Sequence, residues 1–242
     1  MNKNMHSNHR HYVTLFACLT FVLSILLVSC KDSSTSSEDP DDNDFETCGD
    51  TLKDIDGNRY KTIQFGDQCW TAEDMRARSY NDGSAILNIE DDETWASMSM
   101  GAWAYYANDE FNSDINGKMY NWYAVNNSRG ICPTGWRVPS DDDWKTLEIT
   151  LGMTPEQADG VEWRGDDEGE ILRDSNGFSA VLGGSRSGNG AFSAGGNNGA
   201  WWSSTEYNDF NAWARFLYYD ISKVYRNNYD KRNGSFIRCL LN

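Results

Sequence analysis

The pattern of polar and apolar positions divides the chain into three parts. Residues 12–28 are almost continuously apolar, whereas residues 31–44 contain no large apolar side chain. From residue 48 onward, short apolar and aromatic runs alternate with Gly, Asn, Ser and Asp. This pattern predicts one folded domain at residues 48–242, preceded by two segments that cannot contribute a core.

The clearest helical pattern of the domain covers residues 140–151. Ser140 can act as the N-cap, and Asp143 occupies the capping-box position three residues later. Apolar residues at helical spacing follow, and Gly152 supplies a stop signal. Weaker patterns predict helices over residues 118–125 and 92–98 and a helical turn that opens at Thr154-Pro155.

Alternating and β-branched runs predict short strands between these helices. Residues 52–55 and 60–63 should form a hairpin that turns at Asp56-Gly57. Asp54 opens a stretch similar to a calcium loop, but position twelve of that loop is Phe65 rather than Glu, which favours the turn. Aromatic runs at residues 215–219 and 235–239 predict further strands. The expected fold class is α+β with much loop.

The first 29 residues have the pattern of an export signal. Lys3, Arg10 and three histidines precede the apolar run, which ends in Leu27-Val28-Ser29-Cys30. This ending resembles the lipobox of bacterial lipoproteins, which implies that residues 1–29 are removed and that Cys30 is acylated and held in the lipid bilayer. The alternative is an uncleaved N-terminal anchor.

Residues 30–47 form an acidic, Ser- and Asp-rich stretch, which predicts a solvated tether. Its opening, Lys31-Asp32, resembles the surface-export signal of Bacteroidetes lipoproteins. The expected location is therefore the outer membrane or cell surface.

Composition and charge narrow the classes of function. Hydrophobic residues make up 39% of the chain and charged residues 24%, values that exclude a collagen-like or wholly disordered protein. The net charge of −16 would repel a phosphate backbone, so nucleic-acid binding is not expected.

Four cysteines remain in the domain: Cys48, Cys69, Cys132 and Cys239. An even number in an exported chain predicts two disulfides, with three possible connectivities. Cys48 and Cys69 flank the predicted hairpin, and if they pair, the other two close a loop of 107 residues. No C-x-x-C spacing occurs and no His follows residue 11, so neither zinc nor another cofactor is predicted.

Catalytic chemistry has little support in the domain. It lacks a histidine base, and a serine nucleophile at Ser203 with Glu206 as partner would lack the base that activates serine. The tripeptide Arg164-Gly165-Asp166 is interpreted as a chance match to an integrin motif.

Aromatic residues among Asn, Asp and Gly are better candidates for ligand contacts, since loops would present them. The predicted ligand-binding residues are Trp103, Tyr105, Tyr106, Tyr207, Tyr225 and Tyr229.

Several segments resemble the Fibrobacter succinogenes major paralogous domain, which recurs in surface proteins of Bacteroidetes and their relatives. The segments lie at residues 56–63, 120–125, 132–140, 177–180, 183–186, 201–206 and 237–239. The block at residues 135–144 also resembles sulfatase-modifying factors, which have a variant of the C-type-lectin-like fold. This implies a twisted, mostly antiparallel sheet with two main helices and long loops. Those enzymes use two copper-binding cysteines near the C-terminus, where this chain has only Cys239.

These observations lead to one hypothesis and two alternatives. The leading hypothesis is a non-catalytic surface lipoprotein whose lectin-like domain binds a glycan or a surface or host protein. One alternative is a structural or assembly subunit of a surface appendage or complex. A formylglycine-generating type of enzyme is the less favoured alternative.

Overall fold

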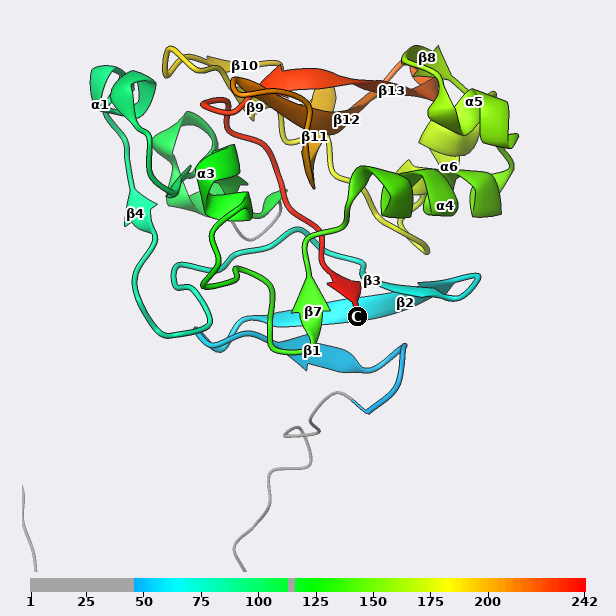
Figure 1. The fold of residues 1–242 in the computed structure, drawn as a ribbon, viewed down its shortest axis with the longest axis horizontal. Coiled ribbons are helices and arrows are strands. Elements are labelled where there is room, and N and C mark those ends of the chain that lie inside the picture. Colours follow the sequence, from blue (N-terminus) through cyan, green and yellow to red (C-terminus); the bar gives the residue numbers. More distant parts are fainter. Residues whose placement is uncertain (1–45, 113–115) are drawn as a thin grey trace, which may run out of the picture. The chain divides into compact units, whose positions relative to one another are not determined.

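A computed structural model describes residues 46–112 and 116–242 (Figure 1). The predicted signal peptide, Cys30 and nearly all of the predicted tether lie outside the described residues. Within the described ranges, no helix combines the length and apolar character needed to cross a bilayer. The domain mixes short helices with mostly antiparallel sheets, which confirms the α+β class.

Two sheets contain the early and the late strands of the domain. The first has the order β1-β2-β3-β14-β7, and it comprises β1 (Thr51–Lys53), β2 (Arg59–Phe65), β3 (Gln68–Thr71), β14 (Leu240–Leu241) and β7 (Trp136–Arg137). The second has the order β11-β12-β13-β8, and it comprises β11 (Asn198–Glu206), β12 (Asn211–Tyr218), β13 (Ile221–Asp230) and β8 (Glu162–Arg164).

The remaining strands form two smaller sheets. They are β4 (Leu87–Asn88), β5 (Ala102–Ala104) and β6 (Met119–Tyr120) in one sheet, and β9 (Ser185–Arg186) with β10 (Phe192–Ser193) in the other. Among the described strands, β4 and β5 are the only neighbours within a sheet that pair in parallel.

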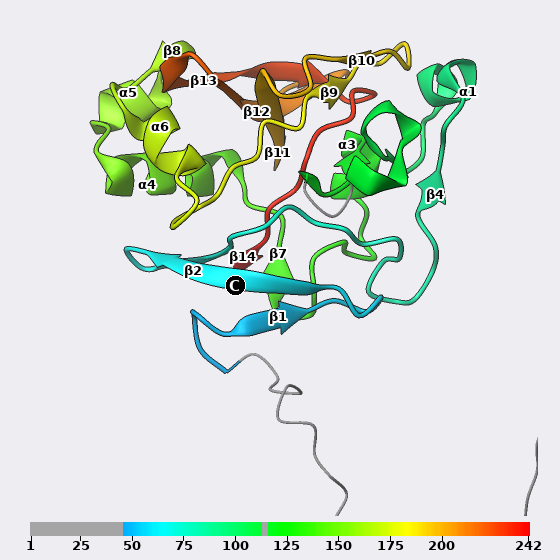
Figure 2. The same ribbon diagram turned by 180° about the vertical axis from the view of Figure 1, so that it is seen from behind.

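The segment between β13 and β14 connects the two large sheets (Figures 1 and 2). Ser235 bridges to Tyr120 and Phe236 bridges to Trp201 before Leu240 pairs with Trp70 of β3. Of the strand predicted at residues 235–239, only Ser235 and Phe236 make bridges, each to a different neighbour, and residues 237–239 belong to no strand.

The predicted helix at residues 140–151 is confirmed as α4 (Asp141–Leu151). The Ser140 hydroxyl accepts from the Asp143 N–H, and the Asp143 carboxylate accepts from the Ser140 N–H at 2.7 Å, which completes the capping box. The helix predicted at residues 92–98 is α1 (Asp92–Ser97), and the turn at Thr154 opens α5 (Pro155–Asp159).

The prediction of a helix over residues 118–125 is wrong in its first half. Tyr120 lies in β6, where it pairs with Trp103 of β5. Within this range only α3 (Trp122–Val125) is helical, and Asn121 is its N-cap. Among the described elements α4 is the only helix longer than six residues, so two main helices are not present as expected.

The other short helices are η1 (Tyr106–Asn108), η2 (Glu110–Asn112) and α6 (Glu168–Arg173). Gly169 allows α6 to lie directly on β13, since a Cβ at this position would come within 2.4 Å of the Lys223 carbonyl oxygen. This close approach explains why a helix contains glycine near its start.

The predicted hairpin is formed by β1 and β2, with Lys53 opposite Arg59. The Asp54 carboxylate accepts the N–H groups of Asp56 (3.0 Å) and Asn58 (2.9 Å), so this aspartate stabilises the turn. Among the residues that the structure describes, no three His, Cys, Asp or Glu side chains are grouped to hold a metal ion.

Two disulfides fasten the first sheet. One joins Cys48 to Cys69, and the other joins Cys132 to Cys239 across 107 residues of sequence. In the chain-entropy description these loops contribute about 3 and 5 kcal/mol, respectively.

Candidate functional site

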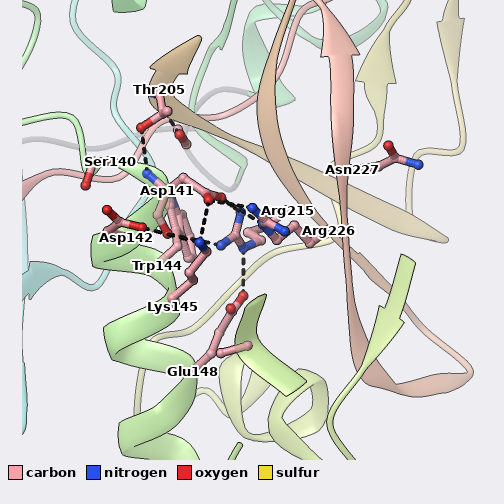
Figure 3. A network of polar contacts seen from close by, with 12 residues as sticks. Ser140, Asp141, Asp142, Trp144, Lys145, Glu148, Thr205, Arg215, Arg226 and Asn227 are labelled. Carbon is pink, nitrogen blue, oxygen red and sulfur yellow. Dashed lines mark hydrogen bonds and ion pairs between the residues drawn. The ribbon is translucent and has the colours of Figure 1, made fainter. Parts of the chain in front are cut away.

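A cluster of five buried charged side chains lies between α4 and the β11-β12-β13-β8 sheet (Figure 3). Asp141 and Glu148 come from α4, while Arg215, Arg226 and Arg164 come from β12, β13 and β8. We call these five residues the ionic core. The helix periodicity places both carboxylates on the face that meets the sheet.

Each carboxylate of the ionic core binds two arginines. Asp141 accepts from Arg215 Nη1 at 2.7 Å and from Arg226 Nη2 at 2.7 Å. Glu148 accepts from Arg215 Nε at 2.7 Å and from Arg164 Nη1 and Nη2 at 2.7 and 2.8 Å. Arg215 thus links the two acids.

The pairing of Asp141 determines its ionisation. Burial alone would raise the pKa of Asp141, but hydrogen bonds from Arg226 and the charge of Arg215 hold that pKa well below its usual value. All four carboxylate oxygens accept hydrogen bonds. The ionic core therefore joins α4 to the sheet and offers no free carboxylate for acid–base chemistry.

Arg164, the first residue of the apparent integrin motif, is one of these buried arginines and is only 4% exposed. Its guanidinium is bound to Glu148 and to the Ala158 carbonyl oxygen. The interpretation of the tripeptide as a chance match agrees with this placement.

Ser203 and Glu206, considered above as a nucleophile with its partner, have other contacts. The buried Ser203 hydroxyl accepts from the Thr205 N–H at 2.9 Å. Glu206 forms an ion pair with Lys231 at the end of β11.

Two of the six predicted ligand-binding aromatics surround a buried lysine. Trp103 lies in β5 and is only 5% exposed, so the expectation that a loop presents it is wrong. The Lys118 Nζ lies 5.1 Å from the Trp103 ring and 5.3 Å from the Tyr105 ring. Burial and the charge of Arg78 lower the pKa of Lys118 to about 8.

The rings of Tyr106 and Tyr207 pack on other residues. The Tyr106 ring packs on Phe192 at 5.7 Å, and its hydroxyl accepts from the Gly195 N–H. Tyr207 is half exposed and packs edge-on against Trp213 at 4.9 Å. The structure therefore does not gather the six predicted aromatics in one place.

Tyr225 and Tyr229 belong to a larger group of rings on one face of the second sheet. Successive ring contacts join Trp163 to Tyr225 (5.0 Å), Tyr225 to Phe216 (5.8 Å) and Phe216 to Tyr229 (5.0 Å). Tyr218 also packs on Trp163, at 5.3 Å. We call these five residues the aromatic row.

Strand alternation produces the aromatic row. In the pairing of β8, β13 and β12, Trp163 is opposite Tyr225 and Tyr225 is opposite Phe216, so their side chains share a face. The residues next to them, such as Arg164 and Arg226, point to the other face and enter the ionic core. The same alternation thus builds both features.

The aromatic row changes from exposed to buried along its length. Trp163, on the edge strand β8, is 39% exposed, whereas Tyr229 packs on the fully buried Trp202 at 5.5 Å. Neighbouring rings are inclined by 59° to 86°, so they form no flat platform. At the exposed end, the rings of Tyr218 and Tyr225 are inclined to that of Trp163.

Three members of the aromatic row, Trp163, Phe216 and Tyr218, were not among the predicted ligand-binding residues. The sequence signal for a strand around Trp163 was weak, because β8 has only three residues, too few to show an alternating polar and apolar pattern.

The fold and these side chains define a disulfide-bonded α+β domain with a buried ionic core and a partly exposed aromatic row. Residues 63–240, well over half of the chain, match the Fibrobacter succinogenes major domain, and the chain belongs to this family. No curated protein and no solved structure matches the chain.

Proposed function

We propose that this protein is a non-catalytic recognition protein of the outer membrane or cell surface that binds a glycan through the aromatic row. The predicted signal peptide, acylation at Cys30 and the acidic tether support the location. In this proposal the tether holds the domain at a distance from the bilayer.

The exposed end of the aromatic row is the observation that carries the proposal. Trp163, Tyr218 and Tyr225 offer ring faces, which suit the apolar C–H faces of a sugar. Asn227 lies beside them and donates to the Tyr225 hydroxyl at 3.0 Å, which orients a polar edge next to the rings. Amides and hydroxyls of this kind can pair with sugar hydroxyls.

We also propose that the domain is a variant of the C-type-lectin-like fold, distantly related to sulfatase-modifying factors. The mostly antiparallel sheets and the position of α4, which begins within the block at residues 135–144, support this relationship. The helices α3 and α4, on either side of residue 130, follow each other in the expected order, although α3 has only four residues.

A glycan array followed by titration of the full chain tests the proposed function. The Trp163→Ala variant should raise the Kd of an identified glycan at least about tenfold, because exposed aromatic anchors dominate small interfaces. Trp163 lies on an edge strand, so its removal should leave the fold intact.

Phe210→Ala is the matched control, since Phe210 is 76% exposed and lies outside the aromatic row. It should leave the Kd unchanged. An equal loss in both variants, or the absence of any glycan ligand for the folded chain, would refute the proposal and favour the assembly subunit.

A further inference from the structure

A second site lies away from the aromatic row, in a cavity of about 760 Å³. Its walls come from the chain around Tyr80, from residues 99–101 and from α3 with the loop that follows it. A Cβ at Gly101 would come within 1.9 Å of the Tyr80 hydroxyl, so this wall requires glycine.

The charge of the cavity is opposite to that of the protein as a whole. The chain has 37 acidic and 21 basic side chains, yet no acidic residue lines this cavity. Arg129 is the one charged residue among those that line it. Because no carboxylate lines this cavity, a negatively charged group can bind beside Arg129 without a like charge in the cavity wall.

Arg129 is held in place although it is exposed. Its guanidinium lies 4.1 Å from the Tyr80 ring centre, Nη1 donates to Ser84 Oγ at 2.7 Å, and Nε donates to Asn127 Oδ1 at 3.0 Å. The nearby Asp82 accepts from the same Ser84 hydroxyl, and its charge also interacts with that of Arg129. The hydrogen bonds to Asn127 and Ser84 use Nε and Nη1, so Nη2 can donate to a ligand.

The remaining walls suit a ligand with many hydroxyl groups. The Tyr123 ring is half-buried at the cavity, and the exposed Asn126 side chain makes no hydrogen bond within the part of the chain that the structure describes. Ser99 and Ser128 add two hydroxyls. Together with the apolar Leu87 and Met100, these groups can contact both the C–H face and the hydroxyls of a sugar.

We infer that this cavity binds a carboxylate-bearing sugar of the hexuronic acid class. The Arg129 guanidinium pairs with the carboxylate, Asn126 and Asn127 contact ring hydroxyls, and Tyr123 packs on the sugar face. This inference does not depend on the aromatic row, whose residues lie on other strands.

Isothermal titration of the full chain with a galacturonic acid trisaccharide, and with the neutral galactose trisaccharide of the same linkage, tests this inference. The acidic sugar should bind at least about tenfold more tightly than the neutral one, and added salt should reduce the difference. Arg129→Met should abolish the preference, and Asn126→Ala should weaken the binding of both sugars.

Arg232→Met is the matched control, because Arg232 is an exposed arginine that does not line the cavity. It should bind the acidic sugar like the wild type, as should Trp163→Ala. Urea unfolding of each variant verifies that it is folded. Equal binding of the two sugars, no saturable binding of the acidic sugar, or an unchanged preference in Arg129→Met would overturn the inference. Loss in Trp163→Ala alone would assign binding to the aromatic row and overturn it as well.

Discussion

Replacing Glu148 with Gln tests whether the ionic core stabilises the domain. Glu148 is fully buried and accepts three hydrogen bonds from Arg164 and Arg215. In the variant, Asp141 is the only carboxylate left among the three buried arginines. Removing one partner of a buried ion pair costs about 3–5 kcal/mol, because the opposite charge stays buried without compensation. For a domain of this size the loss corresponds to a decrease in Tm of about 6–20 °C.

Urea unfolding with the disulfides intact, followed by tryptophan fluorescence, measures the effect. Trp144 lies in the core beside Arg215, with the guanidinium 5.9 Å from its ring, so it reports on this region. The destabilisation should persist at high salt, since buried pairs are screened much less than exposed ones.

Glu170→Gln provides the control, since Glu170 is an exposed acid on α6. Its effect should stay within about 0.5 kcal/mol. If Glu148→Gln lowers the free energy of unfolding by no more than this control does, the reasoning about the ionic core is refuted.

Two further predictions concern single buried groups. Because burial lowers the pKa of Lys118 to about 8, the unfolded chain holds this proton more tightly, and the free energy of unfolding should rise with pH above 8. In urea unfolding between pH 7 and 10, Lys118→Met should remove that rise. The same dependence on pH in the variant and the wild type would contradict the prediction. Ser235→Ala deletes a fully buried hydroxyl that has no hydrogen-bond partner among the described residues, so it should raise the free energy of unfolding by about 1 kcal/mol. A loss of stability would show that the hydroxyl has a partner.

Local signals in the sequence predicted the elements that depend on local interactions. The capping box of Ser140 and Asp143 forms α4 through contacts three residues apart. The turn at Asp56-Gly57 is stabilised by the neighbouring Asp54. Such contacts need no other part of the chain, and so the pattern of residues was sufficient to predict them.

Strand β13 shows why other elements were missed. Its middle contains Arg226, Asn227 and Asn228, residues that in isolation indicate a loop. Arg226 lies inside the fold only because Asp141, 85 residues earlier, neutralises it. A pattern-based prediction cannot assign a charged residue to the interior before its distant partner is known.

The amino-acid sequence by itself determined the α+β class, α4, the first hairpin, the family and the number of domain cysteines available for pairing. Only the tertiary structure decided which aromatics lie together, because Trp163, Phe216 and Tyr225 come from three strands and meet only through strand pairing. It also decided that Trp103 is buried beside Lys118 and that Arg129 lies over Tyr80. Ring contacts and ion pairs act over a few ångströms in space, and residues far apart in sequence reach that distance only in the folded chain.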